Sequence, residues 1–225
     1  MSRLRVTLAA VLAGTALLTS CSSGGDAADS DHGTRQADKP AAAPAAEPIT
    51  REISQAHLTQ ALLGDGENLP GYSLHGDKDV TDGRYCNAAE DADTAPRGWV
   101  RGGDSSYEHN GSTVEMAYIA ICLFDSTDAA HRQYTTWKGD GTRKQVTPKK
   151  PLGDENTLVA VGDDSFYGYL RSGRATVRVR VEGGAAGDPS GAQTMLAATL
   201  KRLQQLQDGQ PATATAADEQ AGARQ

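Results

Sequence analysis

Residues 166–181 read FYGYLRSGRATVRVRV, and this stretch determines how the rest of the chain can fold. Its aromatic and β-branched content predicts two strands, near Phe166–Leu170 and over Arg174–Val181, joined by a tight turn at Ser172-Gly173. Apolar and polar residues alternate in the second strand, which predicts that one of its faces is buried. The residues on that face are Ala175, Val177, Val179 and Val181. We therefore predict an antiparallel hairpin.

A second hairpin is predicted upstream of the first. Asn110-Gly111 is typical of a two-residue turn between strands. A short strand over Ser105–His109 precedes this turn. Thr113–Phe124, the longest apolar run after the first 20 residues, follows it. We expect this apolar run to be a central strand of the sheet.

Three segments have the signals of helices. We expect helices over residues 50–63, from 125 or 126 to about 138, and from 188 towards 207. In the last, Asp188 is the N-cap, Pro189 follows in the first turn, and leucines recur at helical spacing. Residues 139–156 read as a loop. The predicted fold class is α+β: a single domain whose antiparallel sheet is flanked by about three helices and covered on one face.

Polar segments flank this domain on both sides. Residues 22–49 contain mostly Ser, Gly, Asp, Ala and Pro, and cannot bury enough apolar surface to offset the entropy of ordering them. As a flexible coil they would reach roughly 30 Å. Residues 208–225 are similarly polar, and we expect them to be disordered. The domain is therefore predicted over residues 50–207.

The first 20 residues have the layout of a secretory signal. Arg3 and Arg5 precede an apolar run over Val6–Leu18, and small residues follow it. The run is shorter than the roughly 20 residues that span a bilayer. The sequence Leu18-Thr19-Ser20-Cys21 resembles the lipobox of bacterial lipoproteins. This resemblance implies cleavage after Ser20 and lipidation of Cys21; the alternative is an ordinary signal peptide with an incidental cysteine.

The charge of the chain limits its partners. The whole chain has a net charge of −7, and removal of the two arginines of the signal gives −9 for the mature chain. Nucleic-acid binding rewards clustered Lys and Arg, so we expect no nucleic-acid partner. An acidic chain is also repelled by an anionic membrane surface. Contact with membrane lipid is therefore expected through an acylated Cys21, and two or more acyl chains would anchor it stably.

The chain has three cysteines. If Cys21 carries lipid, Cys86 and Cys122 remain as a pair in an oxidising compartment, which predicts a disulfide. Two separate buried thiols are the alternative. A metal site is not expected, because no second Cys or His stands at ligand spacing beside either residue. No cofactor is expected either.

Several of these features occur together in one family. They are Ala61-Leu62-Leu63 with Leu69-Pro70-Gly71, Cys86 and Cys122, the helical segment Ala129–Trp137 after a long strand, and Gly162-Asp163-Asp164-Ser165 followed by Gly173–Val179. The pattern resembles the extracellular sensor domain of PknH-type receptor kinases and the small lipoproteins that share it. The resemblance implies a sheet with helices around a cleft, stabilised by disulfides, and a binding role rather than catalysis. The kinase sensors have two disulfides, whereas this chain can form one.

The second strand of the first hairpin carries the candidate binding residues. Arg174, Arg178 and Arg180 lie on the face opposite the valines. In an acidic protein, such a positive stripe could hold a carboxylate or a phosphate through bidentate hydrogen bonds. The alternative is a solvated face on which these arginines pair with nearby glutamates, Glu108, Glu115 or Glu182.

The sequence carries no recognisable catalytic motif. Asp163-Asp164 could act as a carboxylate pair, although a turn explains it without chemistry. We therefore predict a lipid-anchored, non-enzymatic, sensor-like lipoprotein that faces outside the cytoplasm at the cell membrane. It would capture an envelope ligand or a membrane-spanning protein partner. The alternatives are an envelope hydrolase whose site is assembled from distant residues, and a structural assembly factor.

Overall fold

The hairpin predicted at residues 166–181 is formed by β6 (Ser165–Ser172) and β7 (Ala175–Glu182) in the computed structural model. The structure describes residues 47–79, 83–87, 94–183 and 186–222. Gly173 makes the turn with a φ of +55°, and a Cβ there would lie 2.1 Å from the carbonyl oxygen of Ile49. Both the positive φ and the close approach therefore require glycine at this position.

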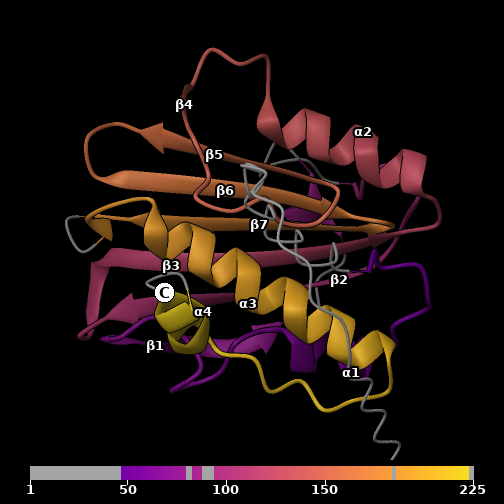
Figure 1. Ribbon diagram of the computed structural model, residues 1–225, viewed down its shortest axis with the longest axis horizontal. Helices are drawn as coiled ribbons and strands as arrows, with labels where there is room; N and C mark the ends of the chain where they lie inside the picture. The colour runs from indigo at the N-terminus through magenta and orange to yellow at the C-terminus, as the bar shows by residue number, and fades with distance from the viewer. Residues whose placement is uncertain (1–46, 80–82, 88–93, 184–185, 223–225) are drawn as a thin grey trace, which may run out of the picture. The chain divides into compact units, whose positions relative to one another are not determined.

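The hairpin belongs to a seven-stranded antiparallel sheet with the order β1-β2-β3-β7-β6-β5-β4 (Figure 1). The other strands are β1 (Tyr72–Asp79), β2 (Trp99–His109), β3 (Ser112–Phe124), β4 (Lys144–Val146) and β5 (Glu155–Val161). The two predicted hairpins meet at the centre, where β3 pairs with β7 and Ile119 stands opposite Val179. The predicted α+β class with an antiparallel sheet is confirmed.

One face of the sheet is covered by α1 (Gln55–Ala61), α3 (Ser190–Gln207) and α4 (Ala216–Gly222). We call it the closed face. Figure 1 shows α3 lying across the sheet. The valines of β7 face these helices and belong to the larger hydrophobic core, together with Leu196 and Leu203 of α3. Burial of each such side chain contributes about 1.5–3 kcal/mol.

The other face, which we call the open face, is covered in part by α2 (Thr127–Lys138). A second apolar cluster lies there: Tyr134 and Trp137 of α2 pack with Val159 and Tyr169, whose neighbours Leu158 and Leu170 point into the closed-face core. Successive strand residues point to opposite faces, so the two clusters lie on opposite sides of the sheet. The expectation that only one face is covered was wrong, because α2 follows β3 and packs back over the opposite side.

Several elements differ from the sequence-based expectation. The first helix begins at Gln55 rather than near Thr50, because Ser54 is the N-cap and its hydroxyl accepts a hydrogen bond from the backbone N–H of His57. The strands β4 and β5 begin within 139–156, which was expected to be a loop. Polar residues at the start of β5, such as Asn156, hide its strand character.

The segment after residue 207 also differs from the expectation, which was disorder. Arg202 of α3 is buried, and its guanidinium donates hydrogen bonds to the carbonyl oxygens of Gln60 and Ala214 at 2.7 and 3.1 Å. The backbone N–H of Ala216 donates to the carbonyl of Glu67 at 2.8 Å. A buried guanidinium needs acceptors, and the C-terminal segment supplies one of them, so it packs against the domain despite its polar composition.

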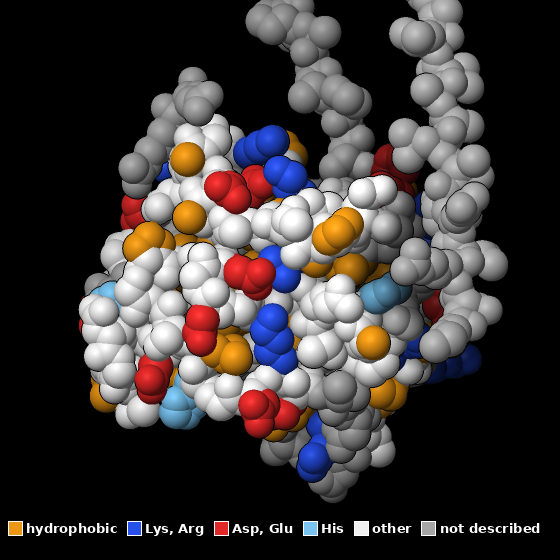
Figure 2. Space-filling model, turned by 90° about the horizontal axis from the view of Figure 1, so that it is seen from below, with side chains coloured by type: hydrophobic (Ala, Val, Ile, Leu, Met, Phe, Trp, Pro, Cys, Tyr) orange, Lys and Arg blue, Asp and Glu red, His pale blue; other side chains and the backbone are white. Residues whose placement is uncertain are grey.

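The N-terminal boundary of the domain lies slightly before the predicted residue 50. Ile49 is fully buried, and the carbonyl oxygens of Glu47 and Pro48 accept hydrogen bonds from α3 side chains. Cys21 and most of the predicted tether lie outside the described residues. Within the described part of the chain, no helix is both long enough and apolar enough to cross a membrane. The view in Figure 2 shows acidic and basic side chains interspersed, with small hydrophobic areas between them.

Candidate ligand-binding site

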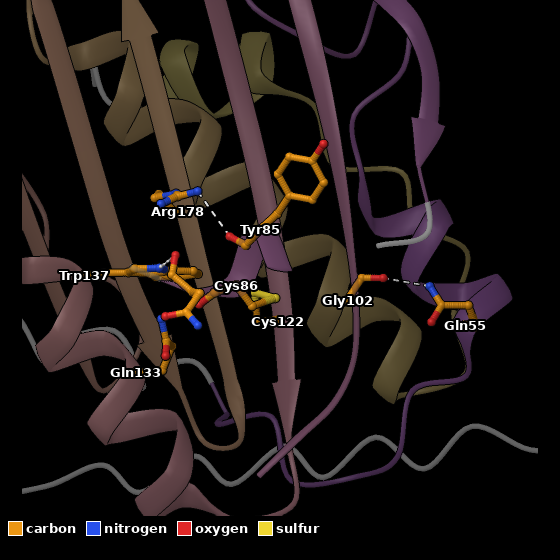
Figure 3. Close-up of a disulfide and its surroundings, with 9 residues drawn as sticks. Gln55, Tyr85, Cys86, Gly102, Cys122, Gln133, Trp137 and Arg178 are labelled. Atoms are coloured by element: carbon orange, nitrogen blue, oxygen red, sulfur yellow. Dashed lines mark hydrogen bonds between the residues drawn. A yellow bond between two sulfur atoms is a disulfide. The ribbon is translucent and has the colours of Figure 1, made fainter. Parts of the chain in front are cut away.

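A disulfide between Cys86 and Cys122 fixes a short 3-10 helix, η1 (Arg84–Cys86), to the open face. The Cα atoms of the two cysteines are 5.8 Å apart. Two side chains of α2 add to this attachment: Gln133 donates to the carbonyl of Cys86, and the indole N–H of Trp137 donates to the carbonyl of Asn87 at 3.3 Å. Figure 3 shows these groups around the disulfide. The predicted disulfide is confirmed, and it holds η1 beside the arginines of β7.

Arg178 lies between η1 and α2. Its Nη2 donates to the carbonyl oxygen of Tyr85 at 3.2 Å, and its guanidinium carbon lies 5.1 Å from the centre of the Trp137 ring (Figure 3). A guanidinium at this distance from an aromatic ring is held by cation–π attraction. Arg178 is therefore held in place before any ligand arrives.

Arg180 lies two residues further along the same face. Its guanidinium carbon is 4.6 Å from the ring centre of Tyr118 and 5.6 Å from that of Tyr167. Its Nε lies 3.4 Å from a carboxylate oxygen of Glu182, which also accepts a hydrogen bond from the Tyr167 hydroxyl at 2.7 Å. Burial and the nearby Glu182 raise the pKa of Tyr167 to about 12, so this hydroxyl stays a hydrogen-bond donor near neutral pH.

Arg174 does not join the other two arginines. It follows the turn at Gly173, and its backbone N–H donates to the carbonyl of Ile49 at 2.8 Å. Its side chain lines a different hollow, beside Arg51 and Phe124. The candidate stripe predicted from the sequence is thus divided: Arg178 and Arg180 lie together, and Arg174 lies apart.

Two hollows of the open face share Arg178 and Arg180. The first, which we call the arginine hollow, has a volume of about 320 Å³. It lies beside α2, and its main lining residues are Trp137, Arg143, Tyr167, Tyr169, Arg178 and Arg180. Arg143 was not singled out from the sequence. Its Nη1 donates to the Tyr169 hydroxyl at 2.6 Å, which brings this guanidinium to the hollow.

The second hollow, which we call the acidic hollow, has a volume of about 280 Å³. Its main lining residues are Asp79, Tyr85, Asp104, Tyr118, Arg178 and Arg180. Asp79 and Asp104 stand opposite each other where β1 pairs with β2. Burial, together with the carboxylate of Asp79, raises the pKa of Asp104 to about 6, although Arg178 acts in the opposite direction.

The other candidates from the sequence do not form a site. Asp163 and Asp164 are exposed in the turn between β5 and β6, where Asp164 accepts a hydrogen bond from the Ser165 hydroxyl at 3.1 Å. His131 pairs with Glu155 rather than with either aspartate. In the part of the chain that the structure describes, no group of three or more His, Cys, Asp and Glu residues could hold a metal ion.

Among known proteins, the chain is similar in structure to an extracellular domain. No family model matches the chain, and no curated protein matches it. The crystal structure of the extracellular domain of PknH from Mycobacterium tuberculosis is similar to 71% of this chain and 99% of its own length, with 14% sequence identity and a TM-score of 0.47. Because the sequence identity and the TM-score are both low, any functional conclusion has to rest on the residues of this chain.

Proposed function

We propose that this protein is a lipid-anchored binding domain outside the cytoplasm, which captures an envelope ligand or a protein partner on its open face without catalysis. The observation that carries the proposal is the pair of hollows that share Arg178 and Arg180. Aromatic rings hold both guanidiniums in place, so little side-chain entropy is lost when a ligand binds. A positioned cluster of polar and aromatic groups in a hollow is typical of ligand sites.

The disulfide supports the location. Disulfides persist in oxidising compartments and are rare in the cytosol of most organisms. The bond between Cys86 and Cys122 therefore fits export directed by the predicted signal. Lipidation of Cys21 would then hold the domain at the outer face of the cell membrane. A lipid anchor ends in one leaflet, so any signal would have to pass through a membrane-spanning partner.

Binding to the open face can be tested by thermal shift. The purified full chain is mixed in turn with soluble peptidoglycan fragments, neutral cell-wall oligosaccharides and phospholipid vesicles. We expect a saturable increase in Tm with at least one probe, and no change in the mass of the probe. Tyr85→Ala should reduce this increase, because Tyr85 is 48% exposed and lines the acidic hollow. Val114→Ala is the matched control, since Val114 is 80% exposed and lies outside both hollows.

Each contrary result points to one of the alternatives. Conversion of a probe to product would favour an envelope hydrolase. No shift with any probe, together with a protein recovered by cross-linking in membranes, would favour an assembly factor. The anchor has its own test: mass spectrometry of membrane-extracted protein should show an acylated Cys21. Cys21→Ser should release the protein from the membrane fraction, and retention would contradict the anchor.

A further inference from the structure

We propose that the arginine hollow binds the phosphate or carboxylate group of a small envelope ligand, with Arg143, Arg178 and Arg180 as its cationic walls. This inference rests on the binding role proposed above and deepens it. It replaces Arg174, which lies elsewhere, with Arg143, which only the folded chain brings to the site.

The charge of the hollow is the first argument. Three guanidiniums line it, and none of the described residues that line it is acidic; Glu182, which lies 3.4 Å from Arg180, offsets one of the three positive charges from outside the lining. The whole chain has a net charge of −7, so this local excess of positive charge runs against the composition of the protein. Arginine presents its N–H donors in a planar fork that matches the oxygens of a carboxylate or a phosphate. The chemistry of the lining therefore selects an oxyanion.

The placement of Arg143 is the second argument. Arg143 lies in an exposed segment between α2 and β4, where a long side chain would ordinarily extend into solvent. Arg143 is itself exposed, but its Nη1 donates to the hydroxyl of Tyr169, which is only 2% exposed. Gly139, with a φ of +75°, ends α2 and lets the chain turn back towards the sheet. The fold therefore aims the third cation at the same hollow.

The neighbouring hollow supplies a contrast. It shares Arg178 and Arg180, but it also contains the carboxylates of Asp79 and Asp104. These carboxylates would repel an anion in the acidic hollow. An anion attracted by Arg178 and Arg180 is therefore expected in the arginine hollow, beside α2. At about 320 Å³ the arginine hollow is near the lower limit of ligand pockets, which suits a ligand of about one substituted sugar ring.

The test compares three sugars that differ in charge. Glucose 6-phosphate, glucuronate and glucose are titrated into the purified full chain by calorimetry. We expect saturable binding of at least one of the two charged sugars and none of glucose at the same concentrations. Which charged sugar binds more tightly decides between the phosphate and the carboxylate. Binding should weaken as salt is raised, because the attraction is between charges.

Substitutions then assign the site. Arg143→Gln should raise Kd at least about tenfold, as expected when a hydrogen bond to a charged group is lost. Arg143→Lys should restore binding only in part, because the forked geometry is absent. Arg132→Gln is the matched control: it removes the same charge from an exposed position of α2 outside the hollow, and should leave Kd unchanged. Circular dichroism checks that each variant is folded.

Three outcomes would overturn the inference: no binding of either charged sugar, equal binding of glucose, or equal effects of Arg143→Gln and Arg132→Gln. These outcomes are distinguishable from failure of the proposed function. If a neutral probe raises Tm in a manner that depends on Tyr85 while neither charged sugar binds, that result would support the binding role and contradict the oxyanion site. If no probe binds in either experiment, both fall.

Discussion

The two faces of the sheet share the same strands but carry different side chains: apolar residues on the closed face, and cations and aromatic rings on the open face. Along β7, Val177 and Val179 point into the closed-face core, whereas Arg178 and Arg180 point to the hollows of the open face. The closed face is an apolar layer under three helices. Among the described elements, the open face has one α-helix, a segment held by a disulfide, and cations stacked on aromatic rings. This difference indicates that stability and ligand binding can be changed separately, by substitutions on opposite faces of the sheet.

The largest effect is expected from the disulfide, the strongest attachment on the open face. Replacing both cysteines (Cys86→Ser with Cys122→Ser) should lower the free energy of unfolding by roughly 4 kcal/mol, because the cross-link closes a loop between residues 36 positions apart. Urea denaturation measures this loss. A loss below about 1 kcal/mol would show that η1 is held mainly by its hydrogen bonds to α2.

The next effect belongs to the closed face. Leu203→Ala should lower the free energy of unfolding by about 3 kcal/mol, since Leu203 of α3 is fully buried in the closed-face core and the substitution leaves a cavity. Under conditions where the variant stays folded, ligand affinity on the open face should not change. Val114→Ala, at an 80% exposed position, should change stability by less than about 0.5 kcal/mol. Weakened binding in folded Leu203→Ala would contradict the separation of the two faces.

A smaller effect concerns the acidic hollow and pH. The pKa of Asp104 is raised from 3.8 to about 6, so between these values the folded state binds more protons than the unfolded state. Stability should therefore fall as pH rises through this window. Because Asp104 is only partly buried, we expect a loss of about 1 kcal/mol after solvent screening.

Asp104→Asn should remove most of this loss and stabilise the protein at pH 7. Unfolding measured at pH 4 and pH 7 tests both statements, with Asp163→Asn in the exposed turn as the matched control. If Asp104→Asn and the unsubstituted chain show the same pH dependence, the carboxylate of Asp104 is not destabilised by its surroundings.

The sequence was most informative about the closed face. Alternation along 175–181 and the turn at Gly173 predicted β7 and its hairpin, because a strand with one buried face has a period of two. The strand β5 was missed because its closed-face residue Asn156 is polar. Its side chain accepts a hydrogen bond from the backbone N–H of Leu152 at 3.0 Å, a contact that no local pattern reveals.

The sequence predicted the open face only in part. The alternation that buries the valines also exposes Arg178 and Arg180, so their shared face could be predicted. Arg143 could not, because β4 and β5 both lie between it and β6 along the chain, and its place at the hollow depends on a hydrogen bond to Tyr169 of β6. The C-terminal segment was misjudged for a similar reason. The composition of this segment does not indicate that the carbonyl of Ala214 accepts a hydrogen bond from the buried Arg202.

The smallest predicted effect concerns the surface charges of the closed face. Lys201 and Glu219 form an exposed ion pair of 3.2 Å between α3 and α4, next to the buried Arg202. Lys201→Gln should cost less than about 1 kcal/mol, because water screens the pair and both side chains lose freedom in forming it. Urea denaturation in low and high salt measures this cost, which should shrink as salt rises. A salt-independent loss above about 2 kcal/mol would show that α4 is held by this pair rather than by the buried contacts of Arg202 and Ala216.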